Sequence, residues 1–183
     1  MDEPDWASVT EEKLWKFLAW HLSENGIDSV LVGGAVVSVY SEGLYRSGDL
    51  DIAYTSYDRA VWLKIQTLMK GLGFNKTSRH FIHPKCKHLF VEYVSPPISI
   101  GEDYQILPAE KEISGKRIKL LSPTDCIKDR LASYVYFKAR ECLDQAILVA
   151  KRQPFLLKEI KRWCDEEGGE AKQAFLEFKN LLS

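Results

Sequence analysis

The chain has 183 residues, enough for one domain, or one domain with a small appendage, around a sizeable hydrophobic core. Hydrophobic residues make up 45% and charged residues 28%, a composition that excludes a disordered or fibrous protein. The formal net charge of −1 excludes a general attraction to nucleic acids or anionic membranes, so any site for a polyanion has to be a local patch.

The sequence shows no targeting or membrane signal. Its first residues, "MDEPDW", are acidic and lack an apolar segment, and no apolar run approaches membrane-spanning length. The four cysteines are widely scattered and form no CxxC pair. We therefore expect a cytoplasmic protein, without a membrane partner, whose cysteines are free and mostly buried.

Helical and strand patterns alternate along the first two thirds of the chain, and the remainder is helical. The first predicted helix is opened by a capping box at Ser8 and Glu11 and ended by Gly26, and it is followed by a strand at 29–32, a turn at Gly33 and Gly34, and a short helix at 35–40. The next predicted elements are a strand at 50–54, a helix capped by Asp58, a strand at 88–94 and a hairpin at 112–121. Three helices complete the chain: one capped by Ser122, one opened by Pro154 and one after residues 166–170. This order predicts a mixed body of helices and sheet at residues 1–120 and a helical part at residues 121–183.

Two aspartates lie in the second predicted strand, which is otherwise apolar. Alternation along a strand puts Asp49 and Asp51 on one face of the sheet. Two carboxylates held a few ångströms apart repel each other, and burying either alone is costly. A divalent cation relieves both problems, and Mg²⁺ takes its remaining ligands from water and substrate phosphates.

The spacing of these aspartates means little alone, because acid-x-acid occurs at four places in the sequence. Only Asp49 and Asp51 also follow an apolar strand, two glycines and a short helix. Gly33 and Gly34 allow a tight turn and a close approach of the backbone to a ligand, with a helix N-terminus facing an anion. The combination predicts a functional site rather than an ordinary turn.

A strand, Gly-Gly, a short helix and Asp-x-Asp, in this order, resemble the signature of the DNA polymerase β-like nucleotidyltransferase superfamily. The resemblance is greatest to its small bacterial branch, which includes abortive-infection and toxin–antitoxin nucleotidyltransferases and aminoglycoside or lincosamide adenylyltransferases. It covers residues 28–94 firmly and the C-terminal part more loosely. It implies an α+β fold, with a mixed β-sheet flanked by helices and a helical C-terminal part.

The resemblance also implies roles for individual residues. Asp49, Asp51 and Glu92 would be the catalytic acids and would bind Mg²⁺ or Mn²⁺, with Glu92 also activating the acceptor hydroxyl. The residues that would bind the nucleotide are Gly33, Gly34, Arg46, Ser47 and Lys128. Asp129 and Arg130 are further candidates for the nucleotide contact beside Lys128. Structural alternatives stay open for three of these residues: Glu92 could pair with a basic residue, Arg46 could be an ordinary surface arginine, and Lys128 could belong to a salt-bridged helix face.

The implied function is transfer of a nucleoside monophosphate from a nucleoside triphosphate to an acceptor hydroxyl of a small molecule, protein or RNA. Two features differ from the usual pattern: fourteen residues separate Gly34 from Asp49, and glutamate replaces the commoner aspartate as third acid. They leave open an alternative, a catalytically inactive module with this fold that binds a protein partner, such as a toxin–antitoxin component.

Residues 75–90 contain four basic residues and three histidines but no acid. Zinc binding by His80, His83, Cys86 and His88 is one alternative, but their spacing matches no structural zinc pattern. A basic rim for a phosphate-bearing acceptor or a nucleic acid is a second alternative, and a solvated hairpin is the third.

Overall fold

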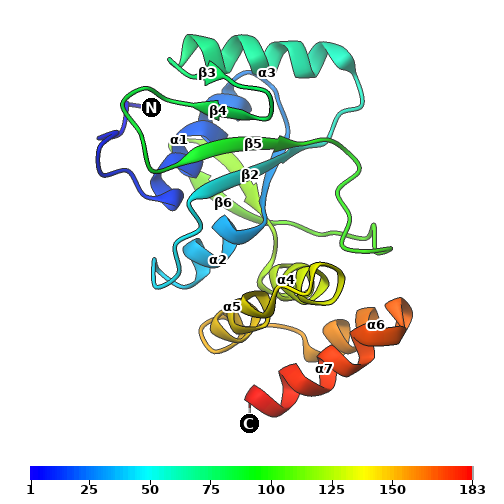
Figure 1. The fold of residues 1–183 in the computed structure, drawn as a ribbon. Coiled ribbons are helices and arrows are strands. Elements are labelled where there is room, and N and C mark those ends of the chain that lie inside the picture. The colour runs from blue at the N-terminus through cyan, green and yellow to red at the C-terminus, as the bar shows by residue number, and fades with distance from the viewer. Residues whose placement is uncertain (183) are drawn as a thin grey trace.

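The computed structural model describes residues 1–182 of the chain. A seven-stranded mixed sheet with the strand order β3-β4-β5-β2-β1-β7-β6 forms the upper half of the molecule, and four helices gather beneath one end of it (Figure 1). The strands are β1 (Ser29–Val32), β2 (Asp49–Tyr54), β3 (Asn75–Lys76), β4 (His80–Ile82), β5 (Phe90–Val94), β6 (Ala109–Ile113) and β7 (Lys116–Leu120). The helices are α1 (Glu11–Glu24), α2 (Gly34–Tyr40), α3 (Arg59–Gly71), α4 (Pro123–Phe137), α5 (Arg140–Ala150), α6 (Leu157–Glu167) and α7 (Gly169–Leu182). The predicted α+β fold is confirmed.

Strand β2 lies at the centre of the sheet, antiparallel to β1 and parallel to β5. Its side chains alternate as the sequence predicts: Leu50 and Ile52 are fully buried, and the two aspartates lie on the opposite face. A single hydrophobic cluster joins the sheet to the C-terminal helices and includes Leu31, Ile127 and Phe178. Burial of this continuous apolar surface holds the helical part against the sheet.

Several predicted ends of elements are confirmed. Asp58 caps α3 and Ser122 caps α4, and Ser114 and Gly115, both with positive φ, form the turn of the hairpin between β6 and β7. The predicted capping box of the first helix is wrong. Thr10 caps α1, whereas the Ser8 hydroxyl donates to the Asp5 carboxylate.

The structure adds elements that the pattern did not predict. Strands β3 and β4 have only two and three residues and extend the sheet at its edge, where a few residues show no clear alternation. Helix α4 ends at Phe137, the next residue, Lys138, adopts the left-handed conformation with φ 57°, and α5 begins at Arg140. No glycine or proline marks this break in the sequence.

All four cysteines are unpaired and buried. None of the helices in the described part of the chain combines the length and the apolar character needed to cross a membrane.

Candidate active site

The register between β2 and β5 brings the predicted acids together. Asp51 is paired with Glu92 across this parallel ladder, and Asp49 is paired with Phe90. Val32, the last residue of β1, is paired with Asp51 on the other side. Asp51 therefore lies between the end of β1 and Glu92, and the three acids share one face of two neighbouring strands.

The two glycines fit closely around these acids. Gly33 follows β1 with a φ of 69°, and a Cβ atom added there would overlap the Asp51 carboxylate. A Cβ atom on Gly34 would lie 2.6 Å from the Ser47 hydroxyl oxygen, and this hydroxyl donates to the Asp49 carboxylate. Any side chain at Gly33 would both strain the backbone and displace the Asp51 carboxylate.

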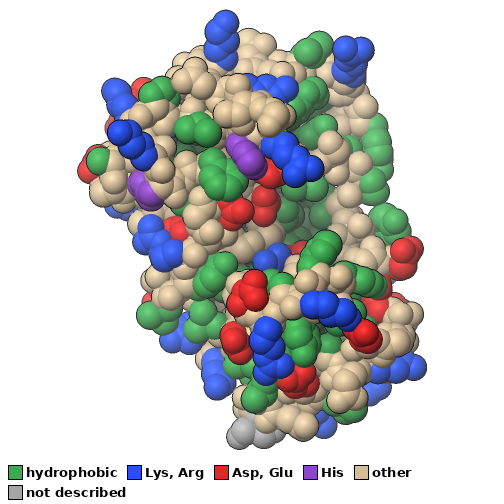
Figure 2. All heavy atoms as spheres, viewed as in Figure 1, with side chains coloured by type: hydrophobic (Ala, Val, Ile, Leu, Met, Phe, Trp, Pro, Cys, Tyr) green, Lys and Arg blue, Asp and Glu red, His purple; other side chains and the backbone are tan. Residues whose placement is uncertain are grey.

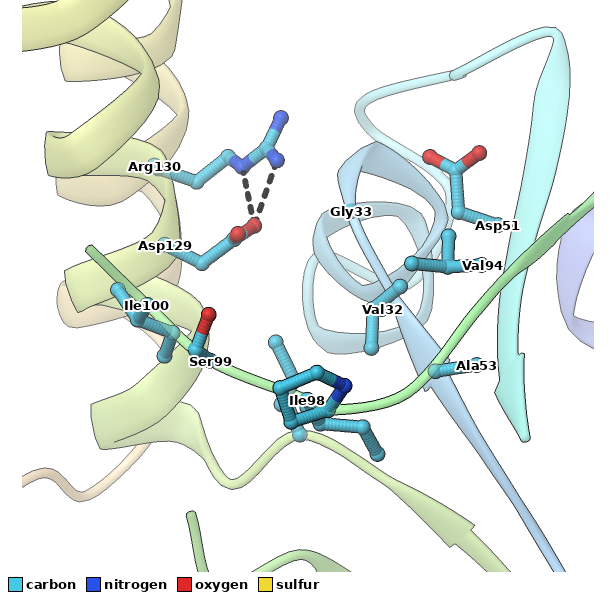
Figure 3. Close-up of a pocket in the computed structure, with 12 residues that line it drawn as sticks. Val32, Gly33, Asp51, Ala53, Val94, Ile98, Ser99, Ile100, Asp129 and Arg130 are labelled. Carbon is cyan, nitrogen blue, oxygen red and sulfur yellow. Dashed lines mark hydrogen bonds and ion pairs between the residues drawn. The ribbon is translucent and has the colours of Figure 1, made fainter. Parts of the chain in front are cut away.

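A cavity of about 290 Å³ opens between Asp51 and helix α4. Asp51 and Gly33 lie on one side of it, Asp129 and Arg130 face them from α4, and the loop from Pro97 to Ile100 forms a further wall (Figure 3). In the space-filling view, acidic side chains and a histidine gather at the edge of a hollow between the upper body and the lower helical part (Figure 2). The cavity thus has one side with the Asp51 carboxylate and an opposite side with the ion pair of Asp129 and Arg130.

The electrostatics differ between these two sides. Burial, and after it the neighbouring charges of Asp49 and Glu92, together raise the pKa of Asp51 to about 7, against a smaller opposing effect of Arg130. Burial by itself would lower the pKa of Arg130, but the charge and hydrogen bonds of Asp129 outweigh this and raise it. Arg130 is therefore cationic at every accessible pH, while Asp51 carries a charge that its surroundings disfavour.

Arg130 is held in place by several partners. Its Nε donates to the Asp129 carboxylate at 3.1 Å and its Nη2 at 2.5 Å, and its Nη1 donates to the Gln145 side chain at 3.4 Å and to the sulfur of Cys142 at 4.0 Å. A guanidinium carries five N–H donors, more than these contacts use. Arg130 thus offers a fixed cation to an anion in the cavity.

Lys128 does not line this cavity. Its side chain is only 3% exposed, and its Nζ lies 2.8 Å from an Asp125 oxygen and 3.0 Å from an Asp103 oxygen. Asp103 belongs to the loop that continues from the cavity wall, and the Trp163 indole also holds this loop by donating to the Ile100 carbonyl at 2.9 Å. Lys128 therefore ties the wall of the cavity to α4, and its predicted phosphate contact stays a prediction.

Arg46 and Ser47 contact α1 as well as the acids. Arg46 Nε lies 2.9 Å from an oxygen of the buried Glu11 carboxylate, and the Ser47 backbone N–H donates to the same carboxylate at 3.0 Å. The half-exposed Arg46 thus helps to fix the segment before β2. The Ser47 hydroxyl orients Asp49, and the predicted nucleotide contacts of both residues stay predictions.

Of the four zinc candidates of the sequence, Cys86 stays near His88, with its sulfur 3.9 Å from Nδ1, but the three histidines separate. His80 lies beside Glu92, His83 stacks on Trp6 with a centroid distance of 3.7 Å, and His88 Nε2 lies 2.8 Å from the Val9 carbonyl oxygen. The strand and loop geometry thus directs these rings to different surroundings, and they do not form a zinc site.

Among residues 1–182, no three His, Cys, Asp or Glu side chains are already arranged around one point as a metal site would be. The donor chemistry of the three acids nevertheless fits Mg²⁺ or Mn²⁺, because these ions prefer carboxylate oxygens. The pKa of Asp51 is raised first by burial and then by the charges of Asp49 and Glu92, and a bound cation would oppose all three effects. The residues present are therefore suited to a divalent cation.

Sequence reasoning missed part of the cavity. Arg130 was only a secondary candidate beside Lys128, because a helical pattern does not show which of two neighbouring cations faces a cavity. The wall from Pro97 to Ile100 reaches the site through a long connection, and its only local signal was the pair of prolines at 96 and 97.

Comparison with solved structures relates this geometry to known proteins. One similar structure is the crystal structure of an antigenic nucleotidyltransferase-like protein from Paracoccidioides brasiliensis. The two chains have a TM-score of 0.68 and 18% sequence identity, and the match covers 95% of this chain and 89% of that protein's chain. The chain has a nucleotidyltransferase-like fold. No protein-family model and no functionally curated protein matches the sequence significantly.

Two structures of the antibiotic-resistance factor ANT(2″)-Ia have the same fold at a lower similarity. The match to its solution structure covers 89% of this chain and 88% of that chain, with 11% sequence identity. The match to its crystal structure in complex with adenylyl-2″-tobramycin covers 93% of this chain and 97% of that chain, with 13% sequence identity. Both have a TM-score of 0.50. The predicted resemblance to the nucleotidyltransferase superfamily is thus confirmed in the fold.

Proposed function

We propose that the protein is a Mg²⁺-dependent nucleotidyltransferase, which moves a nucleoside monophosphate from a nucleoside triphosphate to an acceptor hydroxyl. The observation that carries this proposal is the position of Asp51. It lies beside Glu92 and against Gly33, its pKa is raised to about 7, and it faces Arg130 across a cavity. The similarity of the whole fold to a nucleotidyltransferase-like protein also supports the proposal.

Each residue would have a distinct task in this reaction. Asp49, Asp51 and Glu92 would hold Mg²⁺ or Mn²⁺, which when bound would neutralise negative charge on the reacting phosphates. Gly33 and Gly34 would leave room for the triphosphate, and Arg130 would bind its oxygens from the opposite wall. Glu92, whose side chain is 40% exposed, would accept the proton of the acceptor hydroxyl.

The test is a transfer assay with nucleoside triphosphates labelled at the α-phosphate, in the presence of Mg²⁺ or Mn²⁺. Total RNA, cell protein and aminoglycosides serve as candidate acceptors. We expect label in one of them, and we expect Asp51→Asn to abolish it. Transfer that persists in the Asp49→Asn, Asp51→Asn double variant would contradict the proposed site.

The alternative, an inactive module with the same fold, makes a different prediction. Such a protein would bind its partner equally well after loss of both aspartates. Calorimetry with a triphosphate separates the two cases, since an active site should show binding that strengthens when Mg²⁺ is added. Binding that is absent, or that does not depend on Mg²⁺, would favour the inactive module.

A further inference from the structure

The cavity wall at residues 97–100 leads directly into a tight turn. Ile100 and Asp103 exchange backbone hydrogen bonds of 2.9 and 3.1 Å, and Gly101 between them has a φ of 57°. Figure 3 shows the wall crossing from the strands to helix α4, with Ile100 beside that helix. The turn is closed by its own hydrogen bonds, so a contact that holds the turn also fixes the end of the wall.

Glu167, the last residue of α6, holds this turn although it does not line the cavity. Its Oε1 accepts the Glu102 backbone N–H at 2.6 Å, and its Oε2 accepts the phenol O–H of Tyr136, near the end of α4. The bond to Glu167, and after it burial, raise the pKa of Tyr136 to about 12, so the phenol stays a donor at neutral pH. We call the contacts of Glu167 with Glu102 and Tyr136 the clasp.

Two features of the clasp are unfavourable by themselves. A Cβ atom on Gly101 would overlap the Glu167 carboxylate, and the positive φ at this position disfavours any other residue. A carboxylate in the last turn of a helix is also opposed by the helix dipole. Local strain of this kind is typical of segments whose position matters to a site.

The clasp joins two sides of the cavity that come from distant parts of the chain. The wall supplies Ile98 and Ile100, and α4 supplies Arg130, which lies less than two helical turns before Tyr136. The ion pair of Lys128 with Asp103 joins the same two segments nearer to the start of α4. Two attachments at different points along α4 fix the separation of the wall from the helix, whereas one attachment alone would leave the wall free to pivot.

We propose that Glu167 is a positioning residue for the triphosphate, which acts by setting the separation between the cavity wall and Arg130. This inference rests on the proposed function. Arg130 would bind phosphate oxygens while the apolar side chains of the wall contact the nucleoside, and both contacts form together only at one width of the cavity. Loss of the clasp should therefore weaken binding of the triphosphate and leave the chemical step unchanged.

The experiment compares variants by calorimetry with each ribonucleoside triphosphate and Mg²⁺, and by the KM and kcat of label transfer. The test variants are Glu167→Ala, Gly101→Ala and the double variant. Glu167→Gln is the conservative variant, because its amide oxygen can still accept the Glu102 N–H. The matched control is Glu170→Ala, which removes an exposed acid three residues further along, paired with Lys138. Hydrogen exchange of the Glu102 amide reports on the turn without any ligand.

We expect Glu167→Ala to bind the triphosphate about tenfold more weakly, the effect of one lost hydrogen bond to a charged group. Its KM should rise by the same factor, its kcat should stay within about twofold, and its Glu102 amide should exchange faster. Glu167→Gln and the control should match the wild type. Gly101→Ala should resemble Glu167→Ala, and the double variant should bind no more weakly than either, because both changes remove the same contact.

Equal triphosphate affinity of Glu167→Ala and the control would overturn the inference, and so would a lower kcat with unchanged affinity. Losses that add in the double variant would also overturn it, since the two residues would then act independently. If Gly101→Ala does not fold, Glu167→Ala and Glu167→Gln decide the question by themselves. Absence of Mg²⁺-dependent triphosphate binding in the wild type would show that the proposed function has failed, and the inference with it.

Discussion

Two groups of buried or half-buried carboxylates flank the cavity, and only one of them is neutralised. Asp103 and Asp125 share the ammonium of Lys128 at 3.0 and 2.8 Å, and Arg162 contacts Asp103 at 3.3 Å. On the other side, Asp49, Asp51 and Glu92 lie on adjacent strands, and His80 Nε2, 3.3 Å from a Glu92 oxygen, neutralises charge there only when the ring is protonated.

The difference shows in the pKa values. Burial by itself would raise the pKa of Asp103, but the hydrogen bonds from Lys128, the Gln105 backbone and Arg162, with the charge of Lys128, together outweigh this and lower it, whereas the pKa of Asp51 is raised to about 7. The charges of the first group are compensated within the chain, so loss of its shared cation would leave buried charges unpaired. The second group is left with excess charge, and such excess is typical of sites whose counter-charge comes with a ligand.

The largest expected effect is on catalysis, at the uncompensated group. Glu92→Gln should reduce nucleotidyl transfer by about 10²- to 10⁴-fold, because it removes the proposed proton acceptor. The measurement is the initial rate of label transfer at saturating triphosphate. Glu110→Gln, an exposed acid of the edge strand β6, is the matched control and should keep the wild-type rate. A similar loss in both variants would contradict a special role of Glu92.

The next largest effect concerns the compensated group. Lys128→Met should lower the free energy of unfolding by about 3–5 kcal/mol, because Asp103 and Asp125 stay buried without their shared cation. Urea unfolding measures this change. Lys16→Met removes an exposed pair with Glu12 and should cost at most about 0.5 kcal/mol. Unchanged stability with lost triphosphate binding would instead assign Lys128 to the phosphate.

A third prediction concerns pH. The pKa of Asp51 rises from 3.8 to about 7 on folding, so between these values the folded state holds a proton that the unfolded state releases. The free energy of unfolding should therefore fall as the pH rises through this range, by roughly 2–4 kcal/mol.

Asp51→Asn removes this titration and should flatten the pH dependence, making the variant more stable than the wild type above pH 7 without added metal. Unfolding in urea, followed at a series of pH values without Mg²⁺, measures the difference between the two curves. If the two curves run parallel, folding does not raise the pKa of Asp51, and this difference between the two groups of carboxylates is wrong.

The smallest effect is expected at the pair of His80 and Glu92. The His80 side chain is 34% exposed and that of Glu92 is 40% exposed, so water screens their attraction. His80→Gln should change the transfer rate by at most about fivefold, since such pairs contribute about 0–1 kcal/mol. A loss as large as that of Glu92→Gln would show that His80, rather than the strand register, positions Glu92.

Local sequence patterns were sufficient for the central part of this site. The alternation in β2 placed Asp49 and Asp51 on one face, and the two glycines after β1 predicted the turn that adjoins Asp51. Both inferences succeed because strand periodicity and glycine conformation depend on neighbouring residues alone. The short edge strands β3 and β4 were missed, since two and three residues are too few to show a strand alternation.

The choice between Lys128 and Arg130 could not be made in the same way. The two residues are separated by one position in α4. Their environments differ because Asp103, in the loop between β5 and β6, forms an ion pair with Lys128. Both cations are paired with carboxylates, and which of them also lines the cavity depends on how that loop packs against α4 and α6.

The sequence by itself determined the order of the elements, the face of β2 that carries the aspartates and the need for glycine beside them, because each follows from residues close together in the chain. Only the tertiary structure decided that Glu92 is paired with Asp51, that His80 lies opposite Glu92 and that Arg130 lies on the other side of the cavity. These are relations between distant segments, and they are set by strand register and by the burial of one shared hydrophobic core.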